Sequence, residues 1–213
     1  QGTYYPSDTG GSSEPREAAY RLIAGVEIYG GFAGNETDIM ERLPYVNQVH
    51  LSGDLNNDDN GSGDNSENAY HVFIADNLNG SPPILDGLFI RDGNANGSYY
   101  EHRSGGAIEV RNYSVGSTAL PAVYLTAFIN NEAKDGGAIA ISNQNGGISL
   151  LHCVLANNSA SEDGGAIRSD GATSINNCLL VGNTASEEGG ALHVRDGQLT
   201  LINSTIVQNR GGL

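Results

Sequence analysis

The sequence Gly136-Gly-Ala-Ile-Ala-Ile141 decides the fold, because it returns along the chain at nearly regular intervals. Related segments begin at Gly105, Gly164 and Gly189, and a last glycine pair begins at Gly211. The first residues of successive pairs lie 31, 28, 25 and 22 positions apart. A repeat of roughly this length is typical of a solenoid or an array, in which each unit stacks on its neighbours.

An asparagine precedes each glycine pair of the later units and stands three positions after an apolar residue. The four pairs are Phe128 and Asn131, Leu155 and Asn158, Leu180 and Asn183, and Ile206 and Asn209. The first three asparagines lie 5, 6 and 6 residues before the glycine pair that follows. Two motifs that keep in phase with each other indicate one repeated structural unit.

Apolar and polar residues alternate inside each unit, for example at Ser149-Leu150 and Thr200-Leu201. This period of two is typical of a strand with one buried face, and helical spacing does not fit. A second alternation follows each glycine pair, with Ile108 and Val110 as inward positions of one unit. Because equivalent strands of successive units must pair in parallel, the sequence predicts an all-β fold, a right-handed parallel β-helix.

Glycine and asparagine are expected to form the corners between these strands. Glycine adopts backbone angles that other residues avoid, which suits tight corners at Gly105, Gly136, Gly164 and Gly189. Stacked asparagines can bond to one another's amides and to the backbone along a column. We expect such a ladder at asparagines 131, 158, 183 and 209.

We predict that residues 1–213 form a single β-helix segment of a longer protein. Residues 1–80 are expected to form less regular coils with long loops, and residues 84–213 regular coils. The chain opens without methionine and stops as a repeat begins at Gly211, which suggests that both ends are cut from a longer sequence.

The coupled Phe-x-x-Asn and Gly-Gly-Ala-Ile motifs resemble the repeats of polymorphic outer membrane proteins. The stretch Val26-Glu-Ile-Tyr-Gly-Gly-Phe-Ala-Gly-Asn-Glu-Thr37, followed by Leu51-Ser-Gly-Asp-Leu-Asn56, resembles the opening coils of large secreted bacterial β-helix proteins. This resemblance implies the fold and an extracellular or cell-surface location. It leaves adhesins, passenger domains and polysaccharide-degrading enzymes open, because all of them use such repeats. The chain departs from the pattern at Gly93, which stands where an asparagine would be.

The chain is strongly acidic, with a formal net charge of −15 and a pI near 4.4. Nucleic acids and anionic membrane surfaces require a basic footprint, so we exclude them as partners. No apolar run approaches the 18 or more residues of a membrane helix, so we expect no membrane span in this segment.

An acidic stretch predicts a calcium site. Its alternating oxygen ligands are Asp54, Asn56, Asp58 and Asn60, with Asp64 close behind. The stretch departs from the EF-hand pattern, because Asp59 stands in place of glycine and Asn65 in place of the bidentate glutamate. The alternative is a solvated loop rich in turn-forming residues. Calcium is the only cofactor that the sequence suggests.

An insertion separates Gly93 from Gly105 by 12 residues, against 5 or 6 in the later coils. Insertions in a solenoid tend to lie on its working face, and tyrosines can stack on sugar rings. The insertion therefore predicts a glycan-binding site, although tyrosines folded over the side of the solenoid are an equal alternative. Its candidate residues are Tyr99, Tyr100, His102 and Arg103, next to Glu101.

The outward face of the strands after the glycine pairs carries a second group of candidates. Its two columns read Glu109, Ala140, Arg168, His193 and Arg111, Ser142, Asp170, Arg195. Four of these residues, Arg168, Asp170, His193 and Arg195, could bind an acidic sugar. The simpler interpretation is a solvated sheet with neighbouring opposite charges.

Two cysteines, Cys153 and Cys178, fall in one column of the alignment. A disulfide or redox pair is one interpretation of this placement. Two small thiols stacked in the core are favoured, because free cysteine packs as a small apolar residue.

The sequence favours a non-catalytic, secreted or cell-surface segment, a stalk or adhesin that binds a glycan or other surface proteins. One alternative is a polysaccharide lyase or glycoside hydrolase of the pectin-degrading type, although no outward cluster in the well-aligned coils pairs two aspartates with a base. A second alternative is a structural filament or surface-layer component. An exposed strand edge at the end of a solenoid would allow end-to-end association.

Overall fold

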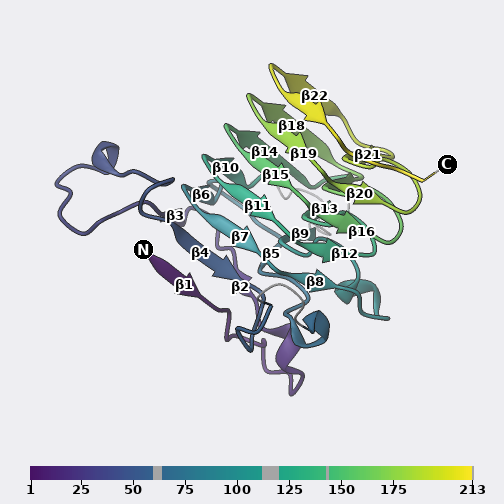
Figure 1. The fold of residues 1–213 in the computed structure, drawn as a ribbon, viewed down its shortest axis with the longest axis horizontal. Coiled ribbons are helices and arrows are strands. Elements are labelled where there is room, and N and C mark those ends of the chain that lie inside the picture. Colours follow the sequence, from purple (N-terminus) through teal and green to yellow (C-terminus); the bar gives the residue numbers. More distant parts are fainter. Residues whose placement is uncertain (60–63, 112–119, 143, 213) are drawn as a thin grey trace.

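The computed structural model describes residues 1–59, 64–111, 120–142 and 144–212. The regular elements of the described chain are short strands and four 3-10 turns. The strands form four sheets, and in each sheet the strands of successive coils pair in parallel. Figure 1 shows the coils stacked in chain order, from the N-terminal strands to the C-terminal end. This arrangement confirms the predicted all-β parallel β-helix.

Each regular coil contributes one strand to each sheet. Sheet A contains β1 (Gly2–Tyr4), β4 (Val49–Ser52), β7 (Phe89–Arg91), β11 (Ala127–Ile129), β15 (Val154–Ala156), β19 (Leu179–Val181) and β23 (Thr205–Val207). Sheet B contains β2 (Tyr20–Arg21), β5 (Phe73–Asp76), β9 (Ile108–Arg111), β13 (Ile139–Ile141), β17 (Ile167–Ser169) and β21 (Leu192–Val194).

The other two sheets complete the coil. Sheet C contains β3 (Glu27–Tyr29), β6 (Ile84–Asp86), β10 (Ala122–Tyr124), β14 (Gly147–Leu151), β18 (Ala172–Asn176) and β22 (Leu199–Ile202). Sheet D is short and contains β8 (Asn94–Ala95), β12 (Glu132–Ala133), β16 (Ser159–Ala160) and β20 (Thr184–Ala185). The 3-10 turns are η1 (Pro15–Glu17), η2 (Ile39–Glu41), η3 (Asn65–Glu67) and η4 (Tyr100–His102).

The register of the sheets follows the repeat. Val123 pairs with Leu150 and Leu150 with Ile175, so residues aligned on the asparagines lie side by side in adjacent coils. These three side chains are fully buried, as are Phe128 and others at equivalent positions in sheets A and B. Burying an aliphatic side chain of this size stabilises the fold by about 1.5–3 kcal/mol, so the stacked columns form the core.

The two cysteines lie inside this core. Cys153 and Cys178 are both free and buried, and the backbone N–H of Cys153 lies 3.3 Å from Cys178 Sγ. The favoured interpretation, two stacked thiols, therefore describes their placement.

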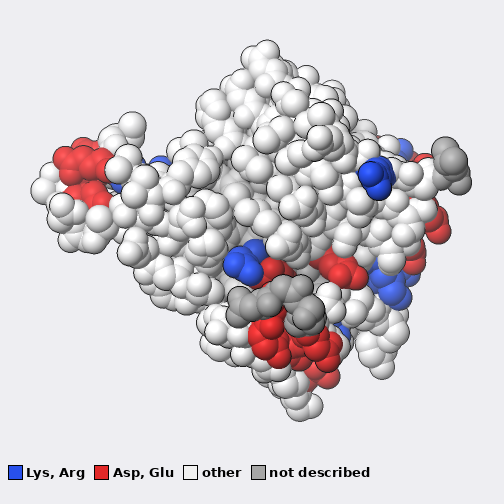
Figure 2. Space-filling model, viewed as in Figure 1, with Lys and Arg blue, Asp and Glu red and all other residues white. Residues whose placement is uncertain are grey.

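The N-terminal coils carry the longest excursions. The connection between β3 and β4 projects from the body of the solenoid in Figure 1. Figure 2 shows acidic side chains gathered on this projection and again low on the same face. Sheets A, B and C run through both portions of the chain, whereas sheet D begins at β8, and the division near residue 80 remains a sequence-based prediction. In its described part, the chain has no helix with the length and apolar character needed to cross a membrane.

Candidate functional site

The corner glycines occupy a backbone conformation that other residues rarely adopt. Gly105, Gly136, Gly164 and Gly189 have φ between +62° and +69°. A Cβ on any of them would lie 2.3 or 2.4 Å from the carbonyl oxygen three residues ahead. Both observations require glycine, so the glycine pairs belong to the scaffold.

The asparagines form a continuous hydrogen-bonded ladder inside the solenoid. Asn131 Nδ2 donates to Asn158 Oδ1 over 3.1 Å, and Asn158 Nδ2 donates to Asn183 Oδ1 over 2.9 Å. Asn183 Nδ2 continues to Asn209 Oδ1 over 2.9 Å. At the irregular position, the backbone N–H of Gly93 donates to Asn131 Oδ1 and so begins the ladder without a side chain. This column also belongs to the scaffold.

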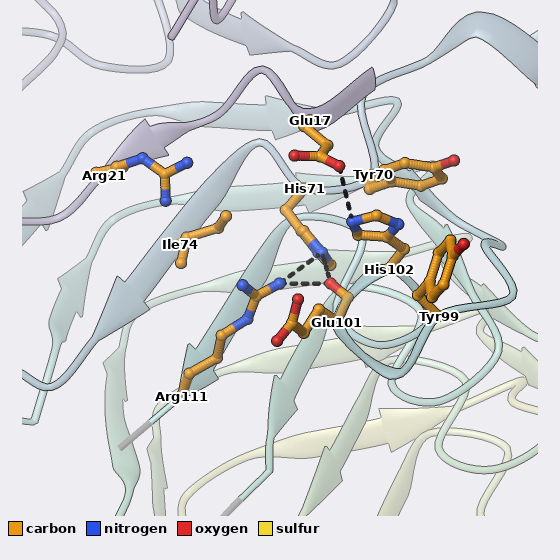
Figure 3. Close-up of a pocket in the computed structure, with 9 residues that line it drawn as sticks. All are labelled: Glu17, Arg21, Tyr70, His71, Ile74, Tyr99, Glu101, His102 and Arg111. Atoms are coloured by element: carbon orange, nitrogen blue, oxygen red, sulfur yellow. Dashed lines mark hydrogen bonds and ion pairs between the residues drawn. The ribbon is translucent and has the colours of Figure 1, made fainter. Parts of the chain in front are cut away.

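A pocket of about 270 Å³ lies where the insertion meets sheet B. Figure 3 shows side chains from the N-terminal segment, β5, the insertion and β9 converging on it. The charged residues that line it are Glu17, Arg21, Glu101 and Arg111. The aromatic rings of Tyr70, His71, Tyr99 and His102 and the apolar side chain of Ile74 complete the lining.

A buried charged cluster lies beside the pocket. Glu109 and Arg111 form an ion pair, and the same carboxylate lies 3.4 Å from His71 Nε2. The Glu109 side chain is 0% exposed and that of His71 only 3%. The His71 ring nitrogens lie 3.0 Å from the carbonyl oxygen of Gly105 and 2.7 Å from that of Glu101. The insertion therefore closes over the cluster with its own backbone.

Burial shifts the proton affinities of both groups. Desolvation raises the pKa of Glu109 to about 7, although the neighbouring Arg111 opposes the shift. Desolvation, assisted by the positive charge of Arg111, lowers the pKa of His71 to about 4. Glu109 Oε1 has no hydrogen-bond partner among the described residues. The pocket thus lies next to a carboxylate that changes its charge near neutral pH.

Aromatic rings form the rim of the pocket. Tyr70 stacks on His102 with ring centroids 4.3 Å apart, and the edge of Tyr99 approaches the same imidazole. The Arg16 guanidinium lies over the Tyr70 ring, 4.1 Å from its centroid. His102 Nε2 is also 3.4 Å from a carboxylate oxygen of Glu17. These contacts fix His102, whereas Tyr99 remains 73% exposed and available to a ligand.

The structure separates the predicted insertion residues. Tyr99 and His102 line the pocket, whereas Tyr100 is exposed and does not. Arg103 turns toward the following coils and pairs with Glu162 at 2.5 Å and Asp135 at 3.4 Å. Arg103 therefore forms ion pairs with the following coils and does not line the pocket.

The four candidates on later coils of sheet B do not join the pocket. Asp170 pairs with Arg168 at 3.2 Å and with Arg195 at 2.8 Å. His193 Nδ1 lies 2.9 Å from a carboxylate oxygen of Asp163. Opposite charges on adjacent strands thus pair with one another on this surface, and the binding of an acidic sugar there stays a prediction.

The structure brings two of the five predicted calcium ligands together. Carboxylate oxygens of Asp54 and Asp58 lie within 4.8 Å of each other and of one from Glu67. Asp64 instead accepts a hydrogen bond from the Ser66 backbone N–H at the start of η3. Asn56 is exposed, and Asn60 lies outside the described residues. Glu67 was missed because only the path of the chain through η3 brings it back to Asp54.

Sequence reasoning also missed Glu17, Arg21, Tyr70 and His71. They lie far from the insertion along the chain, and the N-terminal coil that carries Tyr70 and His71 lacks the glycine pair. One signal was present, because Phe73 and Ala75 repeat the alternation of Ile108 and Val110, their partners in the sheet. Aligning those strands would have placed His71 near the insertion.

Residues 152–170 match the Chlamydia polymorphic membrane protein repeat. This segment contains ladder residue Asn158 and the glycine pair at Gly164. Neither the curated proteins nor the solved structures contain a match to the chain. The repeat match and the parallel sheets agree with each other: the chain is a β-helix repeat protein that resembles the Chlamydia polymorphic membrane proteins.

Proposed function

We propose that this chain is a surface-exposed β-helix segment of the adhesin type that binds a glycan in the pocket between the insertion and sheet B. The resemblance to a membrane protein repeat supports an outer membrane or cell-surface location. The coils that carry the asparagine ladder supply a rigid stalk, and the insertion together with the N-terminal coils beside it supplies the binding site.

The rim of the pocket carries this proposal. Tyr99 presents an exposed ring beside the stacked pair of Tyr70 and His102, and such rings pack against the apolar faces of sugars. Arginine and glutamate side chains in the same lining can donate to and accept from sugar hydroxyl groups. A ligand that combines apolar faces with many hydroxyl groups fits this mixture.

The experiment is a glycan array followed by calorimetry with the best ligands. Tyr99→Ala should weaken binding at least tenfold, because it removes the exposed ring. Tyr100→Ala is the matched control, since the adjacent tyrosine is exposed but does not line the pocket. Absence of binding to any glycan, or an equal loss in both variants, would remove the proposal.

The same samples separate the alternatives. A β-helix lyase or hydrolase would release new reducing ends or unsaturated products from the bound oligosaccharide over time. A structural filament would bind no glycan and would show end-to-end assembly by light scattering. The adhesin proposal requires saturable binding without product.

A further inference from the structure

Glu109 occupies an unusual position for a carboxylate on the outward side of a strand. Its register partners in the adjacent coils are Ile74 and Ala140, so neither neighbouring coil has a charged residue at this position. Its side chain is completely buried, and one of its oxygens has no hydrogen-bond partner among the described residues. An incompletely satisfied buried carboxylate is costly, so its position beside a pocket requires an explanation.

Arg111 connects this carboxylate to the pocket. The arginine lines the pocket, and its guanidinium also contacts Glu109, His71 and the Glu101 carbonyl oxygen. Figure 3 shows the guanidinium end of Arg111 among the pocket residues, next to His71. A carboxylate that entered the pocket would therefore compete with Glu109 for the same cation.

We propose that the pocket binds a carboxylated sugar, and that Arg111 exchanges its ion pair with Glu109 for one with the ligand while Glu109 takes up a proton from solvent. This inference rests on the proposed glycan-binding function and names the ligand class. In the exchange, the ligand carboxylate keeps its charge, Arg111 keeps its proton, and the proton adds to a Glu109 oxygen.

The surrounding charges favour this exchange. Glu101 on the insertion and Asp76 on β5 both raise the proton affinity of Glu109, and the approaching ligand carboxylate would raise it further. His71 is the nearest titratable group after Arg111, and its low pKa keeps it neutral above pH 6.

The pocket has other charged groups besides this cluster. Arg21 supplies a second cation at the pocket, with Asp8 3.5 Å away. The remaining ionisable lining groups, Glu17 and His102, lie 3.4 Å from each other.

The linkage has a calculable size. With a pKa of about 7, Glu109 is mostly protonated at pH 6 and mostly ionised at pH 8. Because only the protonated form leaves Arg111 free, the apparent affinity scales with the protonated fraction and should fall about tenfold between these values. Binding should take up nearly one proton at pH 8 and almost none at pH 6.

Isothermal titration calorimetry tests this linkage directly. Trigalacturonate and sialyllactose are the carboxylated probes, and galactotriose and lactose are their neutral counterparts. Titrations at pH 6, 7 and 8, each in two buffers with different ionisation enthalpies, give the affinity and the number of protons taken up. We expect at least one carboxylated probe to bind more tightly than its neutral counterpart, with the stated tenfold pH dependence.

Two variants test whether Glu109 is the group that takes up the proton when the ligand binds. Glu109→Gln imitates the protonated side chain, so acidic probes should bind it with the same affinity at all three pH values. Asp170→Asn is the matched control, because it removes a carboxylate that pairs with two arginines on the same sheet outside the pocket. This control should retain the pH dependence. If Glu109→Gln fails to fold, proton uptake by the unmodified chain still decides the question.

The outcomes separate this inference from the proposed function. Equal binding of neutral and carboxylated probes would preserve glycan binding and overturn the inference. Tight binding of an acidic probe without proton uptake at pH 8 would also overturn it. If no probe binds at any pH and the array is likewise empty, both proposals fail together.

Discussion

The regular coils and the coil that follows the insertion accommodate buried polar side chains in different ways. In the regular coils, a buried polar side chain such as Asn158 bonds to the identical residue one coil away. In the coil that follows the insertion, Glu109 lies in register with Ala140 but is completely buried and paired with Arg111. Repetition gives the neutral asparagines a partner in the adjacent coil, whereas the buried carboxylate of Glu109 depends on an arginine and a histidine that the repeat does not supply. The chemistry of this solenoid therefore concentrates where its period breaks.

The largest expected effect tests the regular side of this comparison. Gly164→Ala should destabilise the fold severely, because the new Cβ would lie 2.4 Å from the Ile167 carbonyl oxygen at a φ of +67°. Gly34→Ala, on the projecting loop, meets no atom within 4 Å and should cost only backbone strain, about 1–3 kcal/mol. Urea unfolding should show Gly164→Ala to be worse by at least about 2 kcal/mol. Equal losses would mean that the corner is not sterically fixed.

The asparagine ladder is the next most sensitive feature. Asn158→Ala should cost about 3 kcal/mol, because Asn131 loses the acceptor of both its backbone N–H and its Nδ2. Asn209→Ala, at the partly exposed end of the ladder, should cost less, since water can replace the lost partner. Denaturant melts of the two variants measure the difference. An unchanged unfolding midpoint for Asn158→Ala would contradict a stabilising role for the ladder.

The sequence predicted the regular coils well for the same reason that they are stable. Apolar positions such as Val123 and Leu150 recur at a fixed place in each coil, so several coils independently indicate the same strand and the same buried face. The pocket has no such redundancy. His71 meets Glu109 only because coils of unequal length bring them together, and no local pattern encodes that contact. The insertion could be located from the sequence, but only the fold could show that Arg103 leaves it and that Arg111 joins it.

Glu109 and His71 should make two opposite contributions to the pH dependence of stability. The raised pKa of Glu109 makes stability fall as the pH rises from about 4.5 to 7, because the folded state holds a proton that the unfolded state releases. The lowered pKa of His71 makes stability rise between about pH 4 and 6.5. These contributions nearly cancel in the unmodified chain.

A single substitution should expose that cancellation. In Glu109→Gln, the His71 contribution is no longer opposed by Glu109, so from pH 4 to 6.5 the free energy of unfolding should rise by up to about 3 kcal/mol more than in the unmodified chain. Urea titrations across this range provide the measurement, with Asp170→Asn as the control outside the cluster. A Glu109→Gln profile that follows that of the unmodified chain would show that burial does not hold His71 neutral.

The smallest expected effect concerns the acidic loop, where the sequence predicts calcium. Calcium bound by Asp54, Asp58 and Glu67 should stabilise the fold by about 1.4–2.7 kcal/mol in 10 mM calcium if the affinity is that of an extracellular module. Thermal melts with and without calcium measure the gain, which Asp54→Asn should remove. Asp38→Asn, on the projecting loop, should retain it. No shift in the unmodified chain would eliminate calcium from the account.

The central claim, that the working surface lies where the repeat breaks, is tested most directly by hydrogen–deuterium exchange with a bound oligosaccharide. The ligand should slow amide exchange in the insertion around residues 97–103 and in the segment around residues 70–71. Exchange in the regular coils around Arg168 and Arg195 should remain unchanged. Protection confined to those later coils, with none at the insertion, would contradict the account.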